Sequence, residues 1–330
     1  MRHTVKKSVP VAGALLLLLF CAFLSLRLGS THLSHAAFVG GLLGKEGFEG
    51  PTLILRGLRL PRTLAGILAG AGLALSGSLL QTATDNPLAA PNVLGINAGA
   101  GFFVILTMAL FPTAFALLPL TALLGGILTA VLILAISARA GMDKTAVVLC
   151  GVAVSALFGA GISFFSVRDA DLLASYTDFS VGGLRGVTMR ELWLPMGIIL
   201  LCFLAAMLLC PKLRLFCLGD SLAHSLGVSV KRVRFLALAI GAASAAAAVS
   251  FAGLLGFVGL LVPHIARRLA KGSLRTELIL SPLGGGILLL TADLVGRLIF
   301  TPTEIPVGIF TALLGVPFFI ALLFRRCRHA

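Results

Sequence analysis

Charged residues are scarce in this sequence, and their scarcity excludes most soluble folds. They make up 12% of the 330 residues, whereas hydrophobic residues make up 58%. Soluble domains carry about 25% charged residues, and a soluble globule of this length cannot bury so much apolar surface. A bilayer can, because each spanning helix needs about 20 predominantly apolar residues. The apolar runs are continuous and lack the alternation of a membrane β-barrel, so the sequence predicts an all-α polytopic membrane protein.

Motifs that would indicate an enzyme, a metal site or a nucleotide site are also missing. The six cysteines include no CxxC pair, which argues against a disulfide framework or a zinc site. His264 has no second histidine or carboxylate one turn away, so we expect a structural role for it. HExxH, GxSxG and paired-aspartate motifs are absent, and Gly40 to Lys45 lacks the spacing of a P-loop. We therefore expect no catalytic residue, metal or cofactor on this chain.

Acidic residues are few, which bears on whether the chain is an ion-coupled transporter. Ion-coupled secondary transporters keep ionisable groups deep in their helices. Of the 12 acidic residues, only Asp293 lies clearly within an apolar run. Arg297 follows four residues later on the same helix face and is expected to pair with it. A secondary transporter is therefore the less favoured alternative.

The apolar runs predict about ten membrane-spanning helices. The eighth is short and contains Pro263, and the long connections at about 29–60 and 166–190 are expected to be loops, the first of them flexible. We find no separate soluble domain, so residues 1–330 are expected to form a single transmembrane domain. The expected spans are about 10–28, 61–82, 92–111, 115–137, 145–165, 191–210, 232–251, 254–269, 276–299 and 305–324.

Lysine and arginine are distributed unequally between the two sides of this bundle. The side of the N-terminus carries clusters at 212–214, 231–234, 267–275 and 325–328, whereas the other side carries fewer basic residues. Connections on the cytoplasmic side have an excess of Lys and Arg. We therefore expect both termini in the cytoplasm, an uncleaved first helix, and a multi-pass protein of the bacterial inner membrane.

The segment 59–101 combines glycine and proline where a closely packed helix starts and ends. Pro61 suits a helix start. Gly66 and Gly70 form a small-xxx-small stripe that lets helix backbones approach each other. The turn at 85–87 contains Pro87 and breaks the helix.

Together with motifs in the second half, this segment resembles the FecCD/BtuC-like permeases, the iron-chelate and vitamin B12 permease family of ABC importers. It matches an R-x-P-R start followed by N-P-L-A-x-P-x-x-L-G, and residues 256–267 match G-F-x-G-L-x-x-P-H-x-x-R. The matches extend from about residue 59 to 320. The matching residues are Arg59, Pro61, Arg62, Gly77, Gln81, Asn86, Pro87, Leu88, Ala89, Pro91, Leu94, Gly95, Gly219, Ala223, Leu226, Gly227, Val228, Gly253, Gly256, Phe257, Gly259, Leu260, Pro263, His264, Arg267, Asp293, Arg297, Glu304, Pro306, Gly308, Gly315, Pro317 and Phe318.

The resemblance implies a permease subunit of an ATP-driven importer for an iron(III)–siderophore or related metal chelate. Vitamin B12 and haem permeases of the same family are the alternatives. It further implies a homodimer (or a pair with a close paralogue), two cytoplasmic ATPase subunits that bind ATP-Mg, and an extracytoplasmic substrate-binding protein. A nucleic-acid partner is not expected, because the basic residues punctuate the apolar runs and do not cluster on one face.

The connection at about 211–232 is the candidate coupling loop. Asp220 suits the N-cap of a short helix that ends at Gly227. Leu222, Ala223 and Leu226 fall on one side of that helix and form a small apolar knob. The resemblance implies that the knob docks into the ATPase; an ordinary solvated loop is the alternative. The candidate coupling residues are Gly219, Asp220, Leu222, Ala223, Leu226 and Gly227.

Two further sets of residues receive roles from the resemblance. Arg59, Arg62 and Arg297 at the outer mouth are expected to accept acidic residues of the binding protein, with a purely structural pair as the alternative for Arg297. The helix at 145–165 is rich in small residues and is expected to line the translocation path, although simple helix packing also explains its composition. The candidate path and gate residues are Asp143, Lys144, Thr145, Gly151, Ser155 and Gly159.

Overall fold

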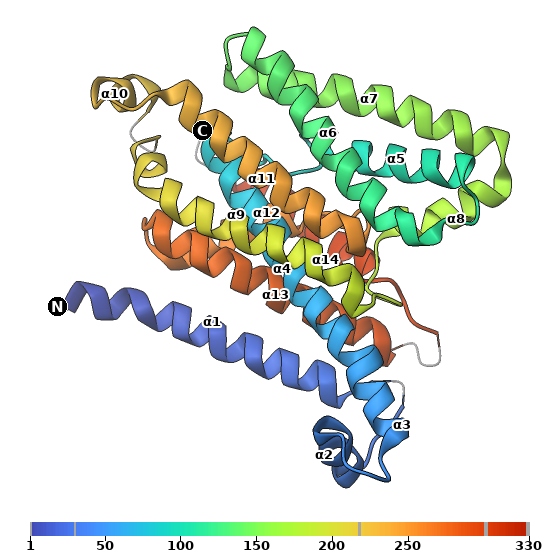
Figure 1. Cartoon of the computed structure of the whole chain (residues 1–330). Coiled ribbons are helices and arrows are strands. Elements are labelled where there is room, and N and C mark those ends of the chain that lie inside the picture. The colour runs from blue at the N-terminus through green and yellow to red at the C-terminus, as the bar shows by residue number, and fades with distance from the viewer. Residues whose placement is uncertain (1, 30, 217–218, 300–302, 328–330) are drawn as a thin grey trace.

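The computed structural model describes residues 2–29, 31–216, 219–299 and 303–327. Within these ranges every regular element is a helix, and the long helices lie roughly side by side (Figure 1). Each predicted span contains a helix, which confirms the all-α fold. These helices are α1 (Arg2–Arg27), α4 (Leu60–Thr84), α5 (Ile96–Leu110), α6 (Leu118–Arg139), α7 (Lys144–Arg168), α9 (Met189–Phe216), α11 (Val230–Ala252), α12 (Val258–Ala270), α13 (Leu274–Ile299) and α14 (Val307–Cys327).

Seven helices of the described part are long and apolar enough to cross a membrane. Helix α5 and the residues 307–321 of α14 are shorter apolar helices, and α12 has 13 residues with Pro263 inside it. The expected shortness of the eighth span is therefore confirmed. The number of about ten crossings and the orientation of the termini stay predictions.

Helix α4 occupies the centre of the molecule, where it packs against α13, α11, α12 and α9 (Figure 1). Glycine makes two of these contacts possible. A Cβ atom on Gly70 would overlap the carbonyl of Gly285 in α13, and one on Gly77 would overlap the carbonyl of Gly259 in α12. The predicted close packing of α4 through small residues is confirmed at these two crossings.

The connection at about 29–60 is largely helical in its described residues, so the expectation of a loop is wrong. It contains α2 (His35–Leu43), α3 (Glu49–Thr52) and a π-helical turn, η1 (Leu53–Arg59), that runs directly into α4. Ser34 caps α2 by accepting a bond from the amide of Ala37. The ring of Phe38 is buried and lies 5.4 Å from the Arg27 guanidinium. These contacts fix the segment to the end of α1.

The connection at 166–190 is also partly helical, in contrast to the expected loop. Helix α8 (Ala170–Val181) begins at Asp169, whose carboxylate accepts bonds from the amides of Asp171 and Leu172. A helix of 12 residues is too short to cross a bilayer. The connection therefore folds back on the bundle, where Tyr176 is buried against α5.

Candidate functional site

Hydrogen-bonded polar residues gather at the two ends of the bundle. The Arg62 end comprises the end of α1, the start of α4 and the end of α13, which are joined by Ser25, Arg62 and Asp293. The Arg234 end comprises the end of α4, the turn between α6 and α7, and the start of α11. Every residue to which the sequence assigns a function lies on one of these ends, or along α7.

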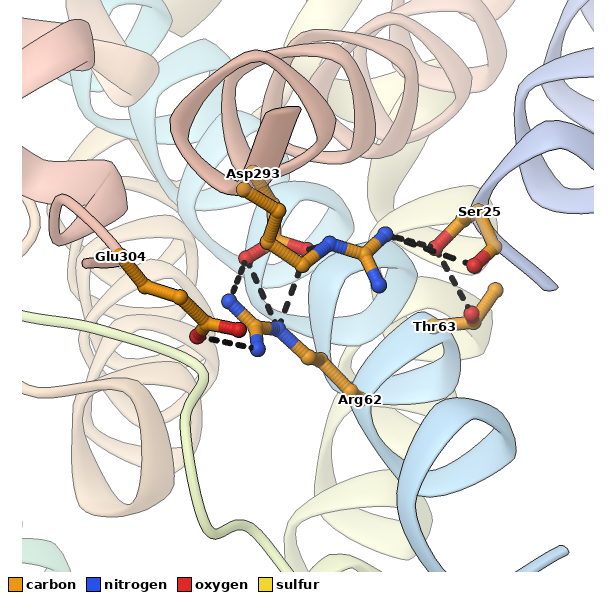
Figure 2. A network of polar contacts seen from close by, with 6 residues as sticks. Ser25, Arg62, Thr63, Asp293 and Glu304 are labelled. Atoms are coloured by element: carbon orange, nitrogen blue, oxygen red, sulfur yellow. Dashed lines mark hydrogen bonds and ion pairs between the residues drawn. The ribbon is translucent and has the colours of Figure 1, made fainter. Parts of the chain in front are cut away.

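At the Arg62 end, Arg62 lies between two carboxylates (Figure 2). Its Nη2 donates to Asp293 Oδ1 at 2.8 Å, and its Nη1 donates to Glu304 Oε2 at 2.7 Å. Asp293 is 2% exposed. A buried carboxylate is stable only when it is paired and hydrogen-bonded, so Arg62 holds the end of α13 and residue 304 on the start of α4.

Asp293 has a second cationic partner in Arg297. Its Oδ2 lies 3.2 Å from Arg297 Nε, so the predicted pair four residues apart is confirmed. Arg297 also donates to Ser25 Oγ at 3.0 Å, and this hydroxyl lies 2.9 Å from Thr63 Oγ1 (Figure 2). The chain of contacts from Glu304 to Ser25 therefore joins α1, α4 and α13 in one polar layer.

Arg59 bonds to backbone carbonyls, and no carboxylate in the described part of the chain pairs with it. Its guanidinium donates to three carbonyls at and after the end of α1, those of Leu26, Arg27 and Thr31. The last carbonyls of a helix lack intrahelical donors and carry partial negative charge. Arg59, which is 5% exposed, satisfies them and anchors α1.

The three predicted docking arginines thus lie at one end of the molecule, and each already has partners within the chain. Two adjoining cavities of about 430 and 360 Å³ open beside them, and both are lined by Arg62, Arg185 and Glu304. Contact with a binding protein stays a prediction.

Tyr176, on α8, is buried, and desolvation raises the pKa of its phenol to about 12, so it stays neutral.

Toward the opposite end, motif residues from the two halves of the chain meet. Gln81 of α4 donates to the carbonyl of Gly259 at 3.2 Å and accepts a bond from Arg267 of α12 at 3.4 Å. Arg267 in turn pairs with Glu277 of α13 at 3.0 Å. The motif segments 59–101 and 256–267 therefore meet at Gln81.

The candidate coupling loop contains a short helix, α10 (Asp220–Ser225), between the end of α9 and the start of α11 (Figure 1). Leu222 and Leu226 are 55% and 58% exposed, as expected for a knob. Ala223 is fully buried and does not belong to the exposed face, which corrects the predicted knob. Gly227 has a φ of +81°, a conformation that suits glycine and ends the helix.

Asp220 does not cap α10, in contrast to the prediction. The N-cap position is Gly219, and no side chain accepts a bond there. The Asp220 carboxylate instead accepts a bond from Arg234 Nη2 at 2.6 Å. Arg234 was not among the predicted site residues.

The candidate gate residues begin α7. Asp143 is the N-cap and accepts a bond from the amide of Thr145 at 3.2 Å. Lys144 pairs with Asp85, at the end of α4, across an exposed gap of 3.2 Å. The gate segment is therefore linked to the central helix by a surface ion pair, which contributes little stability.

Farther along α7, the candidate path residues differ in their surroundings. Gly151 is buried against the backbone of Leu94, and Ser155 bonds back to the Gly151 carbonyl at 2.7 Å. A Cβ on Gly159 would meet no atom within 4 Å. Gly151 therefore serves helix packing, whereas the side of α7 around Gly159 faces open space.

Metal-ligating side chains do not gather in the described part of the chain. No group of three His, Cys, Asp or Glu residues there has the geometry to hold an ion. The His264 ring stacks edge-on against Phe318 with their centroids 5.6 Å apart.

The sequence interpretation missed the role of four residues. Ser25, Glu277 and Glu304 are partners of Arg297, Arg267 and Arg62 respectively, and Arg234 is the fourth. The local sequence contains one usable signal for them, namely that a charge at the end of an apolar run requires a partner. Which residue supplies that partner depends on helix packing.

Known proteins resemble the chain over nearly its whole length. A family model described as the FecCD transport family matches residues 17–325. The Fe(3+)-citrate import system permease protein YfmE of Bacillus subtilis is 38% identical over 98% of this chain and 97% of its own. The ferric enterobactin transport system permease protein FepG of Escherichia coli is 36% identical over 92% of each chain. A solved structure of an inward-facing metal-chelate type ABC transporter superposes with a TM-score of 0.85 at 29% identity, covering 96% of this chain and 98% of that one.

Proposed function

Because the chain belongs to the FecCD transport family, we propose that it is the permease through which an ABC importer takes up an iron(III)–siderophore or a related metal chelate. The chain is a multi-pass protein of the inner membrane, and its role as a permease is non-enzymatic. The observation that carries the choice of cargo is the similarity, over almost the whole chain, to permeases named for ferric citrate and ferric enterobactin. Haem and vitamin B12 are the competing cargoes.

The cargo is tested by uptake into cells that lack this chain and into cells in which it is restored. Labelled ferric citrate, ferric enterobactin, haem and vitamin B12 are supplied separately. We expect an iron(III) chelate to accumulate only in the restored cells. Accumulation of vitamin B12 or haem alone would contradict the proposed cargo and leave the family membership unaffected.

The energy for transport comes, in this proposal, from two cytoplasmic ATPase subunits that bind ATP-Mg. The chain carries no P-loop. Leu222 of α10 and Leu226 directly after this helix are exposed, and exposed basic residues such as Lys212 and Arg232 precede and follow them in the sequence. The basic residues support placing the Arg234 end in the cytoplasm. The ATPases would then dock on α10 and switch the bundle between inward- and outward-open states.

The Arg62 end then faces the binding protein, which delivers the chelate. Acidic residues of the binding protein would approach Arg62 from the adjoining cavities and compete with Glu304 for its guanidinium. The Glu304 side chain is 20% exposed. Arg59 and Arg297 are 5% and 4% exposed, so in this proposal they contribute mainly to the positive potential of that end. Long-range charge of this kind raises the rate of encounter more than the affinity.

Glu304→Gln tests this docking surface without removing an arginine. Arg62 keeps Asp293 as a partner, so the fold is retained, and one competing negative charge is lost. We expect uptake to rise roughly twofold at low ionic strength and to match the unmodified chain at high salt. Glu191→Gln is the control, since Glu191 lies at the same end but bonds to the amide of Thr188. Equal uptake by both variants at all salt concentrations would contradict docking at Arg62.

The translocation path requires a second permease subunit, either an identical copy or a close paralogue. The side of α7 around Gly159 is open, and Leu157 and Phe164 of the same helix are 66% and 62% exposed. We propose that Ser155 and Gly159 lie along the path, whereas Gly151 packs α7 against Leu94, and that the turn before Thr145 lies near its cytoplasmic gate. Co-purification of two differently tagged copies distinguishes the homodimer from the pair of paralogues.

A further inference from the structure

Arg234 is a buried arginine to which the proposed transport mechanism assigns no role. It lies in the first turns of α11 and is 4% exposed, whereas Arg232 two residues earlier is exposed. Burying a guanidinium is unfavourable unless its donors are satisfied. Its partners therefore indicate what the residue holds together.

The Arg234 guanidinium bonds to three separate elements. Nε donates to the carbonyl of Ala83 in the last turn of α4, and Nη1 donates to the carbonyl of Met142 in the turn between α6 and α7, each at 3.0 Å. Nη2 donates to Asp220 of α10 at 2.6 Å. The ring of Phe216, at the end of α9, lies 5.6 Å from the guanidinium carbon. One planar group with donors in a fixed geometry thus sets the relative positions of these elements.

The carbonyls of Ala83 and Met142, to which Arg234 donates, lie beside the candidate gate. Met142 has a φ of +60° and directly precedes Asp143, the N-cap of α7. Ala83 lies two residues before Asp85, which pairs with Lys144. A displacement of the guanidinium would therefore shift both the end of α4 and the start of α7.

The surroundings of α10 make this connection specific. A cavity of about 650 Å³ lies between α10 and the turn at 141–143. Arg234 and Asp220 both line this cavity. Across this cavity, Arg234 connects α10 directly to the end of α4 and to the turn at 141–143 by polar contacts. Loose packing alone would not transmit a movement of α10 to these segments.

We propose that Arg234 is the positioning residue through which movement of α10 reaches α4 and the gate segment at 142–145. The proposal rests on the role of α10 in docking the ATPase. When the ATPases shift α10, the Asp220 carboxylate carries the guanidinium with it, and the guanidinium moves the carbonyls of Ala83 and Met142. Without the arginine, α10 still binds the ATPase but moves independently of the transmembrane helices.

The test compares three variants in the complex with the co-expressed ATPase. We expect Arg234→Met to retain bound ATPase and ATP hydrolysis but to transport at least about tenfold less chelate per ATP, because three charge-assisted bonds are lost. Arg234→Lys should recover part of the transport, since lysine keeps the charge but lacks the planar set of guanidinium donors. Arg232→Met, on the exposed side of the same helix, should transport normally. Native transport per ATP in Arg234→Met would overturn the proposal.

A second measurement does not depend on the cargo and covers the case in which Arg234→Met does not fold. Spin labels are placed on Ser225 of α10 and on Ala140 beside the turn at 141–143, both exposed. In the unmodified complex we expect their separation to stay the same on ATP binding, and in Arg234→Met or Asp220→Asn we expect it to change. An unchanged separation in the variant that folds would overturn the proposal. Normal ATPase binding by Leu222→Asp would instead contradict the docking role of α10.

Discussion

Arg62→Ala is expected to lower the free energy of unfolding by about 3–5 kcal/mol, the usual effect of removing one partner of a buried ion pair. Asp293 and Glu304 each lose a charged hydrogen bond to Arg62. The carboxylate of Asp293 stays buried, and Arg297 then balances it alone. The loss is measured as the shift of the unfolding midpoint of the purified protein in detergent.

Two companion variants show whether the effect comes from buried charge. Arg185→Ala removes an exposed arginine beside the same cavities and should change the unfolding free energy by less than about 0.5 kcal/mol. Adding Glu304→Gln to Arg62→Ala should restore part of the lost stability, because the carboxylate that has lost Arg62 as its cationic partner is removed. Equal and small shifts for Arg62→Ala and Arg185→Ala would show that the polar layer at this end does not stabilise the fold.

Leu222→Asp is expected to abolish the association of the ATPase while the permease still folds and inserts. Leu222 is 55% exposed on α10, so the change creates no cavity in the bundle. An apolar side chain at the centre of an interface contributes about 2 kcal/mol or more, and a charge placed there lacks a partner. This corresponds to at least about a 30-fold loss of affinity, measured as the ATPase that co-purifies with the tagged permease.

His224→Asp is the matched control for Leu222→Asp. His224 lies two positions after Leu222 on α10, which is about 200° around the helix, so its side chain points away from the two leucines. The substitution introduces the same new charge. We expect it to retain most of the bound ATPase. If both variants bind the ATPase normally, α10 is an ordinary solvated helix and another surface couples the subunits.

The sequence interpretation of the Arg234 end was partly right and partly wrong for one physical reason. A short helix ending at Gly227 follows from local backbone preference, which glycine satisfies at a φ of +81°. The burial of Ala223 and the pairing of Asp220 with Arg234 depend on how α10 packs against α9 and α11. Side-chain periodicity within six residues contains no information about that packing.

Sequence alone locates the long apolar helices and explains why they need a membrane, because a continuous apolar run specifies a spanning helix without reference to the rest of the chain. It also determined the pair of Asp293 and Arg297, which are neighbours on one helix. Only the tertiary structure decided that Arg62 joins Asp293 and Glu304, which are 231 and 242 residues away in the sequence. Long-range partners of this kind are selected by helix packing, since any buried charge requires a counter-charge but its own sequence does not specify which one.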